Sequence, residues 1–428
     1  MAFKTESVEA KRSDGVRRAQ ILDAAARRFA SSGYVGTSLR DVADSCGILA
    51  GSLYHHFESK ESIAVELLQN YQDGMNALGC AARVDYRAPR IEEVFERVVS
   101  LATSIASCAI TNRAALQLTQ YEPHAAAGER LLAVAGRRSV AVTSAMNTLL
   151  DDARAVGFFD DGVDVWSLSE QICDSMLHAG SSIVHANAHP QAIAEMTVGI
   201  LFDGLVADEL PDETLNRSAA MAAATDVLKH WSADDSVDHR TALLRAVARV
   251  EFARRGYEAT TVRHIAAATS MGIGSVYRTI GSKRELLDSI MSRFHVQLSA
   301  AYRAVADVSA SPIEKLDALS WINVNALAQF DKEFQIQRAW FRMTPPAESP
   351  VLAAIVQRGR ILERVMSDGF ASGHLDSSGR EPRSSAASVR DLMWIPTHVF
   401  DFLGATAALD HTRRTVLRGA ASGFRRMR

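Results

Sequence analysis

Cysteine is scarce in this chain, which has four cysteines among 428 residues. No two of them have CxxC spacing, and all four lie in the first half of the chain: Cys46, Cys80, Cys108 and Cys173. Disulfide frameworks and zinc sites need closer or more regular spacing. We therefore expect reduced thiols and a cytoplasmic protein.

Long apolar runs are also missing. No run reaches the ~18 residues that a membrane span requires, and residues 1–18 hold no apolar core of a signal peptide. With 47% hydrophobic and 23% charged residues, the composition predicts a soluble, globular chain without a membrane partner. Its length favours two or three domains.

The sequence patterns of common enzymes are absent. The chain has no GxSxG, no Walker A motif and no GxGxxG placed after a strand. His185 and His189 have the spacing of two metal ligands on one helix face, but no third ligand accompanies them and Pro190 follows at once. We expect no catalytic residue, no metal site and no cofactor, so the chain is not predicted to be an enzyme.

A strong overall charge is lacking too, because the net charge is only −3. Positive charge is concentrated in two islands. Residues 239–284 hold nine basic and two acidic side chains, a net +7, and residues 11–60 hold eight basic and five acidic ones, a net +3. Two basic islands in an otherwise acidic chain indicate two local contacts with a polyanion.

The chain contains an internal repeat. Residues 17–61 align without a gap on residues 240–284, at an offset of 223. A weaker match places residues 195–206 on residues 414–426, with Gly204 over Gly423. The pairs of the strong match are mostly Gly, Tyr, Ser, Thr and Lys, which two unrelated Ala- and Arg-rich helices would not share: Phe29/Phe252, Gly33/Gly256, Tyr34/Tyr257, Thr37/Thr260, Arg40/Arg263, Ala43/Ala266, Gly51/Gly274, Ser52/Ser275, Tyr54/Tyr277, Ser59/Ser282 and Lys60/Lys283.

The residue pattern of each copy predicts three helices separated by short turns. Residues 16–31 place apolar side chains at helical spacing, and Gly33 follows where a helix end favours a positive φ. Hydroxyls at 37–38 can cap a short helix that Cys46–Gly47 breaks, and a second short helix follows over about 49–56.

A long helix follows the two short ones. Ser59 can cap it in the first copy, and Ser282 opens a full S-x-x-E capping box in the second copy. Two short helices joined by a tight turn and packed on a longer helix form a helix-turn-helix. Such a motif lays its second short helix in the major groove of DNA.

The second short helix has the chemistry that a groove-binding helix needs. Gly51 and Ser52 keep its surface low, so that backbone can approach bases and phosphates, while Tyr54, His55 and Lys60 offer donors to phosphate oxygens. The start of the preceding helix favours an anion. The expected DNA-binding residues are Thr37, Ser38, Arg40, Leu49, Ala50, Gly51, Ser52, Tyr54, His55 and Lys60 in the first copy, and Thr260, Thr261, Arg263, Ile273, Gly274, Ser275, Tyr277, Arg278 and Lys283 in the second.

These residues resemble the tetracycline-repressor (TetR) family, whose signature is similar to GYxxTSxxxIA followed by GxxxGxLYxHFxSKE. The first copy matches nearly throughout, with GYVGTSLRDVA and GILAGSLYHHFESKE. The second copy, GYEATTVRHIA and SMGIGSVYRTIGSKREL, matches more loosely. In it, Ser270 replaces the turn glycine, Thr279 a histidine and Ile280 a phenylalanine.

The resemblance implies an all-α fold of two tandem units, each with a three-helix DNA-binding domain followed by a helical effector and dimerisation domain. It also implies a double-stranded DNA operator and a small-molecule effector as partners, with repression as the family's usual activity. The expected domains are a flexible N-terminus (1–15), DNA-binding domain 1 (16–70), effector domain 1 (71–230), a linker (231–238), DNA-binding domain 2 (239–294) and effector domain 2 (295–428).

Aromatic side chains of the two larger domains are candidates to line an effector cavity. They are Tyr121, Phe158, Trp166 and His178 in the first unit and Trp321, Phe330 and Trp340 in the second. Aromatic residues at helical spacing more often belong to a core, so core packing is the alternative. The stretch GILAGSLYHHFESKES is similar to regulators of lipid and acyl-CoA catabolism in actinobacteria, which favours an apolar or acyl-type effector.

The assembly and the tail leave alternatives open. Our main hypothesis is an intrachain pseudo-dimer with two unlike half-sites, and a homodimer of chains is the alternative. An architectural DNA-binding protein without an effector is the alternative function. We expect the arginines of the tail to form a solvated helix face rather than a phosphate contact: Arg413, Arg414, Arg418, Arg425, Arg426 and Arg428.

Overall fold

All regular elements of the described chain are helices. A computed structural model describes residues 2–83, 87–120, 128–135, 140–179, 189–207, 210–232, 238–257, 260–340, 350–377 and 380–421. Among these residues, the β structure is confined to one isolated antiparallel bridge between Val206 and Leu375. The all-α fold predicted from the sequence is confirmed.

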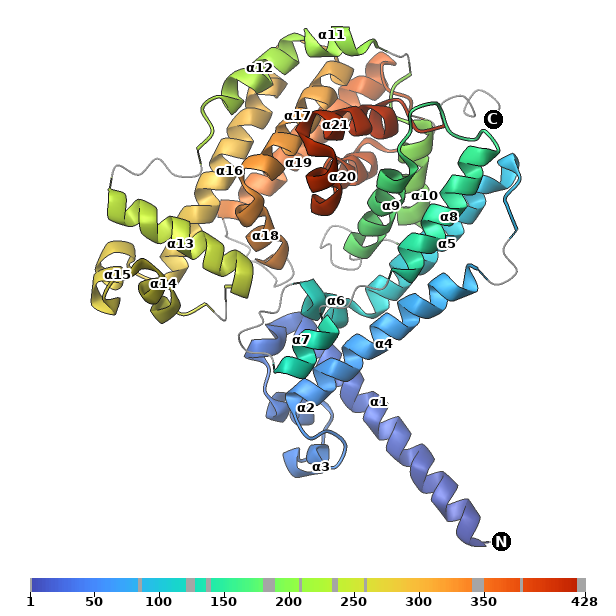
Figure 1. Ribbon diagram of the computed structural model, residues 1–428, viewed down its shortest axis with the longest axis vertical. Coiled ribbons are helices and arrows are strands. Elements are labelled where there is room, and N and C mark those ends of the chain that lie inside the picture. The colour runs from blue at the N-terminus through green and yellow to red at the C-terminus, as the bar shows by residue number, and fades with distance from the viewer. Residues whose placement is uncertain are drawn as a thin grey trace.

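The first unit consists of a small head and a larger helical body (Figure 1). Head 1 comprises α1 (Ala2–Gly36), α2 (Leu39–Ser45) and α3 (Ala50–Tyr54). Body 1 comprises α4 (Lys60–Ala81), η1 (Ile91–Glu93), α5 (Val94–Thr111), α6 (Arg113–Gln120), α7 (Glu129–Ala135), α8 (Ala141–Ala155), α9 (Val165–Ala179) and α10 (Pro190–Asp203).

The second unit repeats this order. Two short helices, α11 (Asp212–Asn216) and α12 (Ala219–Leu228), precede head 2, which comprises α13 (His239–Arg255), α14 (Val262–Thr269) and α15 (Ile273–Ile280). Body 2 comprises α16 (Lys283–Asp307), α17 (Pro312–Gln329), α18 (Asp331–Trp340), α19 (Pro350–Ser372), α20 (Pro382–Leu392), α21 (Thr397–Thr412) and a π-helical turn η2 (Arg413–Leu417).

Both units use the same packing scheme. In head 1, α1 packs on α2, α4 and α6, and in head 2 α13 packs on α14, α16 and α18. In the bodies, α4 packs on α8 and α8 on α9, as α16 packs on α19 and α19 on α20. The repeat that the sequence shows in the heads therefore extends through the bodies, where the sequence similarity has faded.

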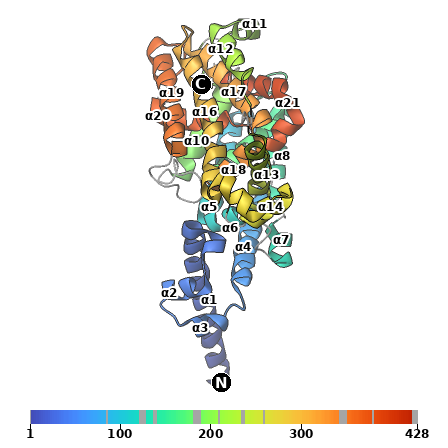
Figure 2. The ribbon, with the colours of Figure 1, turned by 90° about the vertical axis from the view of Figure 1, so that its left-hand side faces the viewer.

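Two boundaries differ from those expected. Helix α1 extends back to Ala2, where we expected a flexible N-terminus before residue 16. Residues 2–15 contain no proline and are rich in helix-forming Ala, Glu, Lys and Arg, which favours continuation of the helix. Figure 2 shows this part of α1 projecting beyond head 1.

The second difference concerns α12, which we expected in the first unit. It packs on α16 and α17 of body 2 instead. The adjacent Trp231 ring packs 5.2 Å from that of Phe330, and the Ser232 carbonyl accepts hydrogen bonds from Arg293 and Gln297 of α16. The seam between the units therefore lies after α10, and residues 210–232 belong structurally to the second unit.

The two bodies meet through their last helices. Helices α9 and α10 pack against α20, α21 and η2. Gly204 and Gly419 lie back to back at the centre of this contact, both with positive φ (74° and 90°). A Cβ added at Gly204 would lie 2.4 Å from backbone atoms of Arg418, and one added at Gly419 would lie 2.4 Å from the carbonyl oxygen of Phe202. Only glycine fits either position.

Backbone hydrogen bonds cross this contact in both directions. The amide of Leu205 donates to the carbonyl of Leu417, and the amide of Ala420 donates to the carbonyl of Leu201, each at 2.8 Å. The near-symmetry of these bonds pairs Gly204 with Gly419. The sequence alignment had placed Gly204 over Gly423, four residues further on, which lies outside the described residues.

The arginines of the tail do not all form a solvated face. Arg413 is buried and forms an ion pair with Asp317 of α17, with Nε 2.7 Å from Oδ1, and it also donates to Asn216 at 2.8 Å. Arg418 pairs with Asp212, while Arg414 lies partly exposed beside Asp410. The expectation of a solvated helix face is thus wrong for Arg413, because the last turn enters the body; Arg425, Arg426 and Arg428 lie outside the described residues.

One helical stretch of the described chain, Ile91–Thr111, is long and apolar enough to cross a membrane. It contains α5, which packs against α4, α8, α9 and α10. Core helices of compact helical domains commonly have this composition. We therefore assign α5 to the centre of body 1.

Candidate nucleic-acid interface

The two heads bury the same positions. In head 1 the rings of Phe29 and Tyr34 lie 5.4 Å apart, and in head 2 those of Phe252 and Tyr257 lie 5.5 Å apart. Ile280 occupies the position of Phe57 in the first copy, and it is also buried. Head 2 therefore retains a buried core although its motif matches the family signature more loosely. The buried positions shared by the heads are Phe29, Leu53 and Phe57 in head 1, and Phe252, Val276 and Ile280 in head 2.

The turns and caps that define each head form as the sequence predicts. Gly33 has a φ of 74°, and Ser59 and Ser282 each begin the following long helix with a capping box. Ser270, which replaces the turn glycine of the second copy, takes a left-handed conformation with a φ of 55°. It is the one non-glycine residue with positive φ in the described part of the chain.

The outer face of α3 is exposed to solvent. Leu53 is its one inward-pointing side chain, whereas Tyr54 is 56% exposed and Leu49, at the start of the helix, is 83% exposed. The predicted contact residues Ala50, Gly51, Ser52 and His55 are also exposed. Figure 1 places α3 at the end of head 1 that faces away from the bodies.

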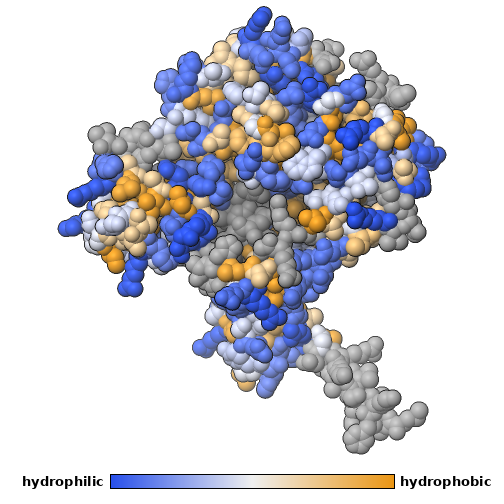
Figure 3. Space-filling model, viewed as in Figure 1, coloured by the Kyte–Doolittle hydropathy of each residue, from blue (hydrophilic) through white to orange (hydrophobic). Residues whose placement is uncertain are grey.

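The outer face of α15 has the same character. Val276 and Ile280 point inward, while Tyr277 is 49% exposed and Ile273 is 42% exposed. Gly274 and Arg278 are exposed and Ser275 is half-buried. The lobe that holds head 2 also shows apolar side chains at its surface (Figure 3), where Leu243 and Val250 of α13 are exposed.

Glycine at the outer face of both helices has no role in the internal packing. A Cβ added at Gly51 or Gly274 would meet no atom of the protein within 4 Å. The neighbouring core therefore does not require glycine at these two positions. A surface that leaves room for a closely approaching partner would require it.

Four of the predicted contact residues (Thr37, Thr260, Lys60 and Lys283) direct their polar groups to partners inside the head rather than toward solvent. Thr37 and Thr260 are buried, and their hydroxyls donate to the carbonyls of Gly33 and Gly256 at 2.8 and 2.7 Å. We therefore correct their assignment as phosphate donors. They share identity in the repeat because they close the corner between the first two helices of each head.

Lys60 and Lys283 hold the same corner from the other side. The ammonium of Lys60 donates to the carbonyls of Tyr34 and Thr37 at 2.7 and 2.9 Å and lies 4.3 Å from the centre of the Tyr34 ring. Lys283 donates to the carbonyl of Tyr257 at 2.9 Å in the same way. These ammonium groups are directed into the head rather than toward a phosphate, which corrects their predicted role.

The starts of α2 and α14 are exposed and capped. The Ser38 hydroxyl accepts from the amide of Asp41 at 3.1 Å, and the Thr261 hydroxyl accepts from the amide of His264 at 3.2 Å. Because both hydroxyls serve as caps, the remaining exposed cations on these helices, Arg40 and Arg263, are the stronger candidates for a phosphate contact.

Ion pairs fix each head to its own body. Arg18 of α1 pairs with Glu66 of α4, and its guanidinium lies 4.1 Å from the centre of the Phe57 ring. In the second unit, Nε of Arg249 on α13 lies 2.5 Å from Oε1 of Glu333 on α18, and both side chains are nearly buried. Burial raises the pKa of Glu333, against the opposing effect of Arg249. No sequence pattern indicates this second contact.

Two of the side chains predicted to line an effector cavity, Phe158 and Phe330, belong to the core. Phe158 packs on Phe159 and Phe202 at 5.1 and 5.4 Å, and Phe330 packs on Phe294 at 5.4 Å. Trp166, His178 and Trp321 have partly exposed side chains, Tyr121 lies outside the described residues, and for Trp340 the structure describes the backbone at the end of α18 only.

None of these side chains lines the pocket of about 350 Å³ that the described residues form between α19 and α20. Phe158 and Phe330 fill the interior because their helices pack closely, so their assignment to an effector cavity is corrected to core packing.

Comparison with known proteins agrees with the geometry of the heads. Residues 21–67 and 244–290 match the family of bacterial regulatory proteins, tetR family. The transcriptional repressor KstR2 of Rhodococcus jostii is 52% identical over 59 residues, which cover 14% of this chain and 29% of the relative. The chain thus spans under a third of the length of the KstR2 repressors that it matches.

Two longer matches are weaker. The repressor KstR of Rhodococcus jostii is 24% identical over 206 residues, covering 47% of this chain and 91% of the relative. A structure of the ketosteroid transcriptional regulator KstR2 of Mycobacterium tuberculosis is 26% identical, covers 43% of this chain and 94% of that chain, and has a TM-score of 0.38. The family match shows that the chain carries two domains of the bacterial regulatory proteins, tetR family, in tandem, at residues 21–67 and 244–290.

Proposed function

We propose that this chain is a sequence-specific, DNA-binding transcription regulator whose α3 and α15 each enter a major groove. The observation that carries the proposal is the repeated pairing of an exposed tyrosine, Tyr54 or Tyr277, with a glycine that the protein's own packing does not need. The KstR2 relatives are named as transcriptional repressors, which favours repression here too. We place this activity in the cytoplasm.

We also propose that the two units act as an intrachain pseudo-dimer. Support comes from the contact of α9 and α10 with α20, α21 and η2, which occupies the last helices of both units at once. Helix-turn-helix dimers bind half-sites about 34–36 Å apart, one helical turn of DNA. Because α3 reads AGSLY and α15 reads IGSVYRTI, the two half-sites should differ in sequence.

Gly51→Ala and Gly274→Ala test whether the outer faces of α3 and α15 approach DNA closely. Alanine favours a helix over glycine by up to about 1 kcal/mol, so each variant should keep or raise its thermal stability. The added methyl group should nevertheless obstruct close approach of DNA and reduce operator affinity about tenfold or more. The measurement is selection of bound duplexes from a random pool, followed by titration of the selected operator.

Tyr54→Ala and Tyr277→Ala complete the design, with Gln69→Ala on the exposed face of α4 as the control. We expect each tyrosine variant to lose binding at one half-site and the control to bind as the wild type does. If the alanine variants of both glycines and both tyrosines bind the operator normally, α3 and α15 do not enter the grooves. If only head 1 variants lose affinity, head 2 serves as a dimer partner rather than a DNA-binding domain.

The number of chains that bind one operator can be tested separately by light scattering and footprinting. A monomeric chain that protects two unlike half-sites supports the pseudo-dimer, whereas a stable dimer of chains on a perfect palindrome contradicts it. The alternative function, an architectural protein, predicts salt-dependent binding without sequence preference. A strong preference for one operator over random duplex supports a regulator.

We propose finally that a small apolar or acyl-type effector controls DNA binding. An effector can act only if it binds the free and DNA-bound conformations with different affinity. The high identity to KstR2 extends over only 59 residues, 14% of this chain, and so does not identify the effector. A thermal-shift screen in which no acyl compound, fatty acid or steroid stabilises the chain would remove this part of the proposal.

A further inference from the structure

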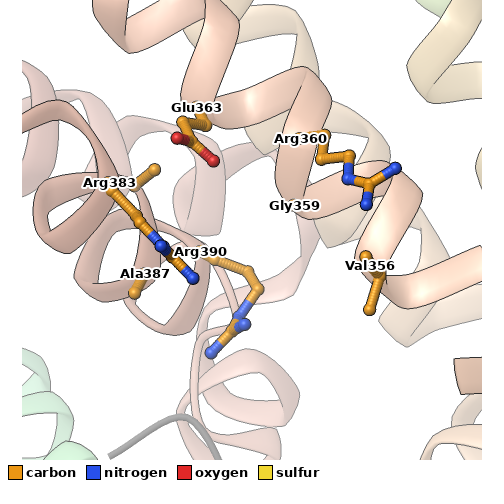
Figure 4. Close-up of a pocket in the computed structure, with 8 residues that line it drawn as sticks. Val356, Gly359, Arg360, Glu363, Arg383, Ala387 and Arg390 are labelled. Atoms are coloured by element: carbon orange, nitrogen blue, oxygen red, sulfur yellow. The ribbon is translucent and has the colours of Figure 1, made fainter. Parts of the chain in front are cut away.

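An arginine-lined pocket opens between α19 and α20 of body 2 (Figure 4). Its volume of about 350 Å³ is sufficient for a small organic molecule. Small residues leave this space open, because Gly359 of α19 faces Ala386 and Ala387 of α20 across it. Val356 adds apolar surface at one side.

The charge of the pocket is predominantly positive. Arg360 of α19 and Arg383 and Arg390 of α20 line it, with Glu363 as the one acidic lining residue. Figure 4 shows the guanidinium groups of Arg383 and Arg390 directed toward the same space, from positions about two helical turns apart on α20. Arg390 is paired with Asp391 at 2.6 Å, while no ion pair within 4.0 Å engages Arg360 or Arg383 among the described residues.

A fourth guanidinium lies behind the pocket. Arg358 is buried, and its partners are the neutral groups Ser299 Oγ at 2.9 Å and His295 Nδ1 at 3.1 Å. No described carboxylate pairs with it. The pKa of Arg358 is lowered to about 10, chiefly by burial and to a smaller extent by the positive charge of Arg390. Among the described residues, His295 Nε2, on the ring that Arg358 contacts, and Asn323 Nδ2 are buried nitrogens without a hydrogen-bond partner.

This arrangement is specific to the second unit. In body 1, α9 packs on α8 as α20 packs on α19. Helix α9 contains no arginine or lysine and carries the acidic residues Glu170 and Asp174 instead. Since the overall packing is shared and the charge is reversed, the positive pocket is not a requirement of the fold.

We propose that the pocket between α19 and α20 binds a small organic anion, with a carboxylate or phosphate group on the guanidinium groups that line it and a short apolar chain along Val356 and the two alanines. Guanidinium groups bind carboxylate and phosphate oxygens through paired N–H donors. An anion would supply a negatively charged partner for Arg360 and Arg383 and a negative charge near the buried Arg358. Its role as an effector rests on the proposed function, but its binding to the chain does not.

The test uses the full chain without DNA and measures binding by isothermal titration calorimetry. The probes are octanoate, octyl phosphate, inorganic phosphate and, as the neutral match, octanol. We expect saturable binding of octanoate or octyl phosphate, whichever head group fits, and none of octanol. Arg360→Gln and Arg383→Gln should each weaken binding about tenfold or more. Glu363→Gln should strengthen it, because a like charge is removed.

Two matched variants separate a specific site from general charge. Arg364→Gln removes an exposed arginine of α19 outside the pocket and should leave binding unchanged, while Arg383→Lys keeps the charge but loses the paired donors and should bind less tightly than wild type. Equal loss with Arg364→Gln, or binding of octanol as tight as that of octanoate, would overturn the proposal.

DNA binding in the absence of anion distinguishes this inference from the proposed function. We expect Arg360→Gln and Arg383→Gln to bind the selected duplex as the wild type does. If they lose DNA affinity and bind no anion, the arginines contact DNA phosphate and the anion site is wrong. If the wild type binds octanoate but no duplex, the regulator function fails while the anion site stands.

Discussion

At the scale of single residues, the turn between the two short helices distinguishes the heads. Gly47 occupies this turn in head 1 with a φ of 65°, and Ser270 occupies the aligned position in head 2 with a φ of 55°. The left-handed conformation costs a residue with a Cβ roughly 1–2 kcal/mol relative to glycine's freedom. Head 2 therefore folds with a local strain that head 1 does not have.

A reciprocal exchange tests this strain. Ser270→Gly should stabilise head 2 by roughly 1 kcal/mol, and Gly47→Ser should destabilise head 1 by a similar amount. We attribute both changes to the left-handed backbone conformation, because neither position is crowded by neighbouring atoms. The measurement is amide hydrogen exchange of α13–α15 and α1–α3, which reports each head separately. Equal exchange in wild type and Ser270→Gly would show that the turn carries no strain.

The sequence predicted which residues matter in the heads better than it predicted what they do. Thr37 and Lys60 match the family signature and recur in the second copy, and their donor groups predict contacts with DNA phosphate oxygens. Their groups instead satisfy carbonyls at the corner of the head. A repeated residue indicates a shared constraint, but donor chemistry alone does not distinguish a constraint of folding from one of binding.

At the scale of elements, a buried ion pair ties η2 to α17 within body 2. Arg413 in η2 bonds both carboxylate oxygens of Asp317 on α17, at 2.7 and 2.8 Å, and also contacts Asn216 of α11. Burial raises the pKa of Asp317 despite the pairing with Arg413. Three elements far apart in sequence therefore depend on a single charge pair.

Removal of one partner should expose that dependence. Arg413→Met leaves the Asp317 carboxylate buried and unpaired, which should cost about 3–5 kcal/mol of unfolding free energy. The double variant Arg413→Met with Asp317→Leu should recover most of this loss, because no uncompensated charge remains. Urea denaturation of the single and double variants gives both values, and a double variant as unstable as the single one would contradict the explanation.

Local sequence patterns predicted helices more reliably than their partners. Capping residues and apolar spacing gave the heads and the long helices that follow them, because these signals act within a few residues. The attachment of α12 to body 2 and the burial of Arg413 depend on surfaces up to two hundred residues away. No periodicity in either segment specifies which surface it will meet.

At the scale of the whole molecule, the joint between the bodies combines close backbone packing with buried polar groups. Gln171 of α9 is buried there, and its amide donates to the carbonyl of Leu392 at 3.0 Å. Its Oε1 lies 2.9 Å from Nε2 of His411 on α21. Across the same joint, Arg380 donates to the carbonyl of Gly204 at 2.9 Å. Both bodies thus supply groups that would be unsatisfied if the units separated.

His411 makes this joint sensitive to acid. Burial lowers its pKa to about 4, well below the ordinary value of 6.5, although Asp164 and Asp410 oppose the shift. The unfolded chain therefore binds a proton before the folded chain does. Stability is retained above pH 6.5, falls as the pH drops toward 4, and changes no further below that, with a total loss of up to about 3 kcal/mol from this group.

His411→Gln keeps a donor for Gln171 and removes the titration. Because the glutamine does not take up a proton, urea denaturation of this variant should show less loss of stability than the wild type between pH 6.5 and 4. The hydrogen exchange of α10 and α21 should follow the same difference, since both helices border the joint. Parallel stability curves for the two proteins over this range would show that protonation of His411 does not couple the joint between the bodies to pH.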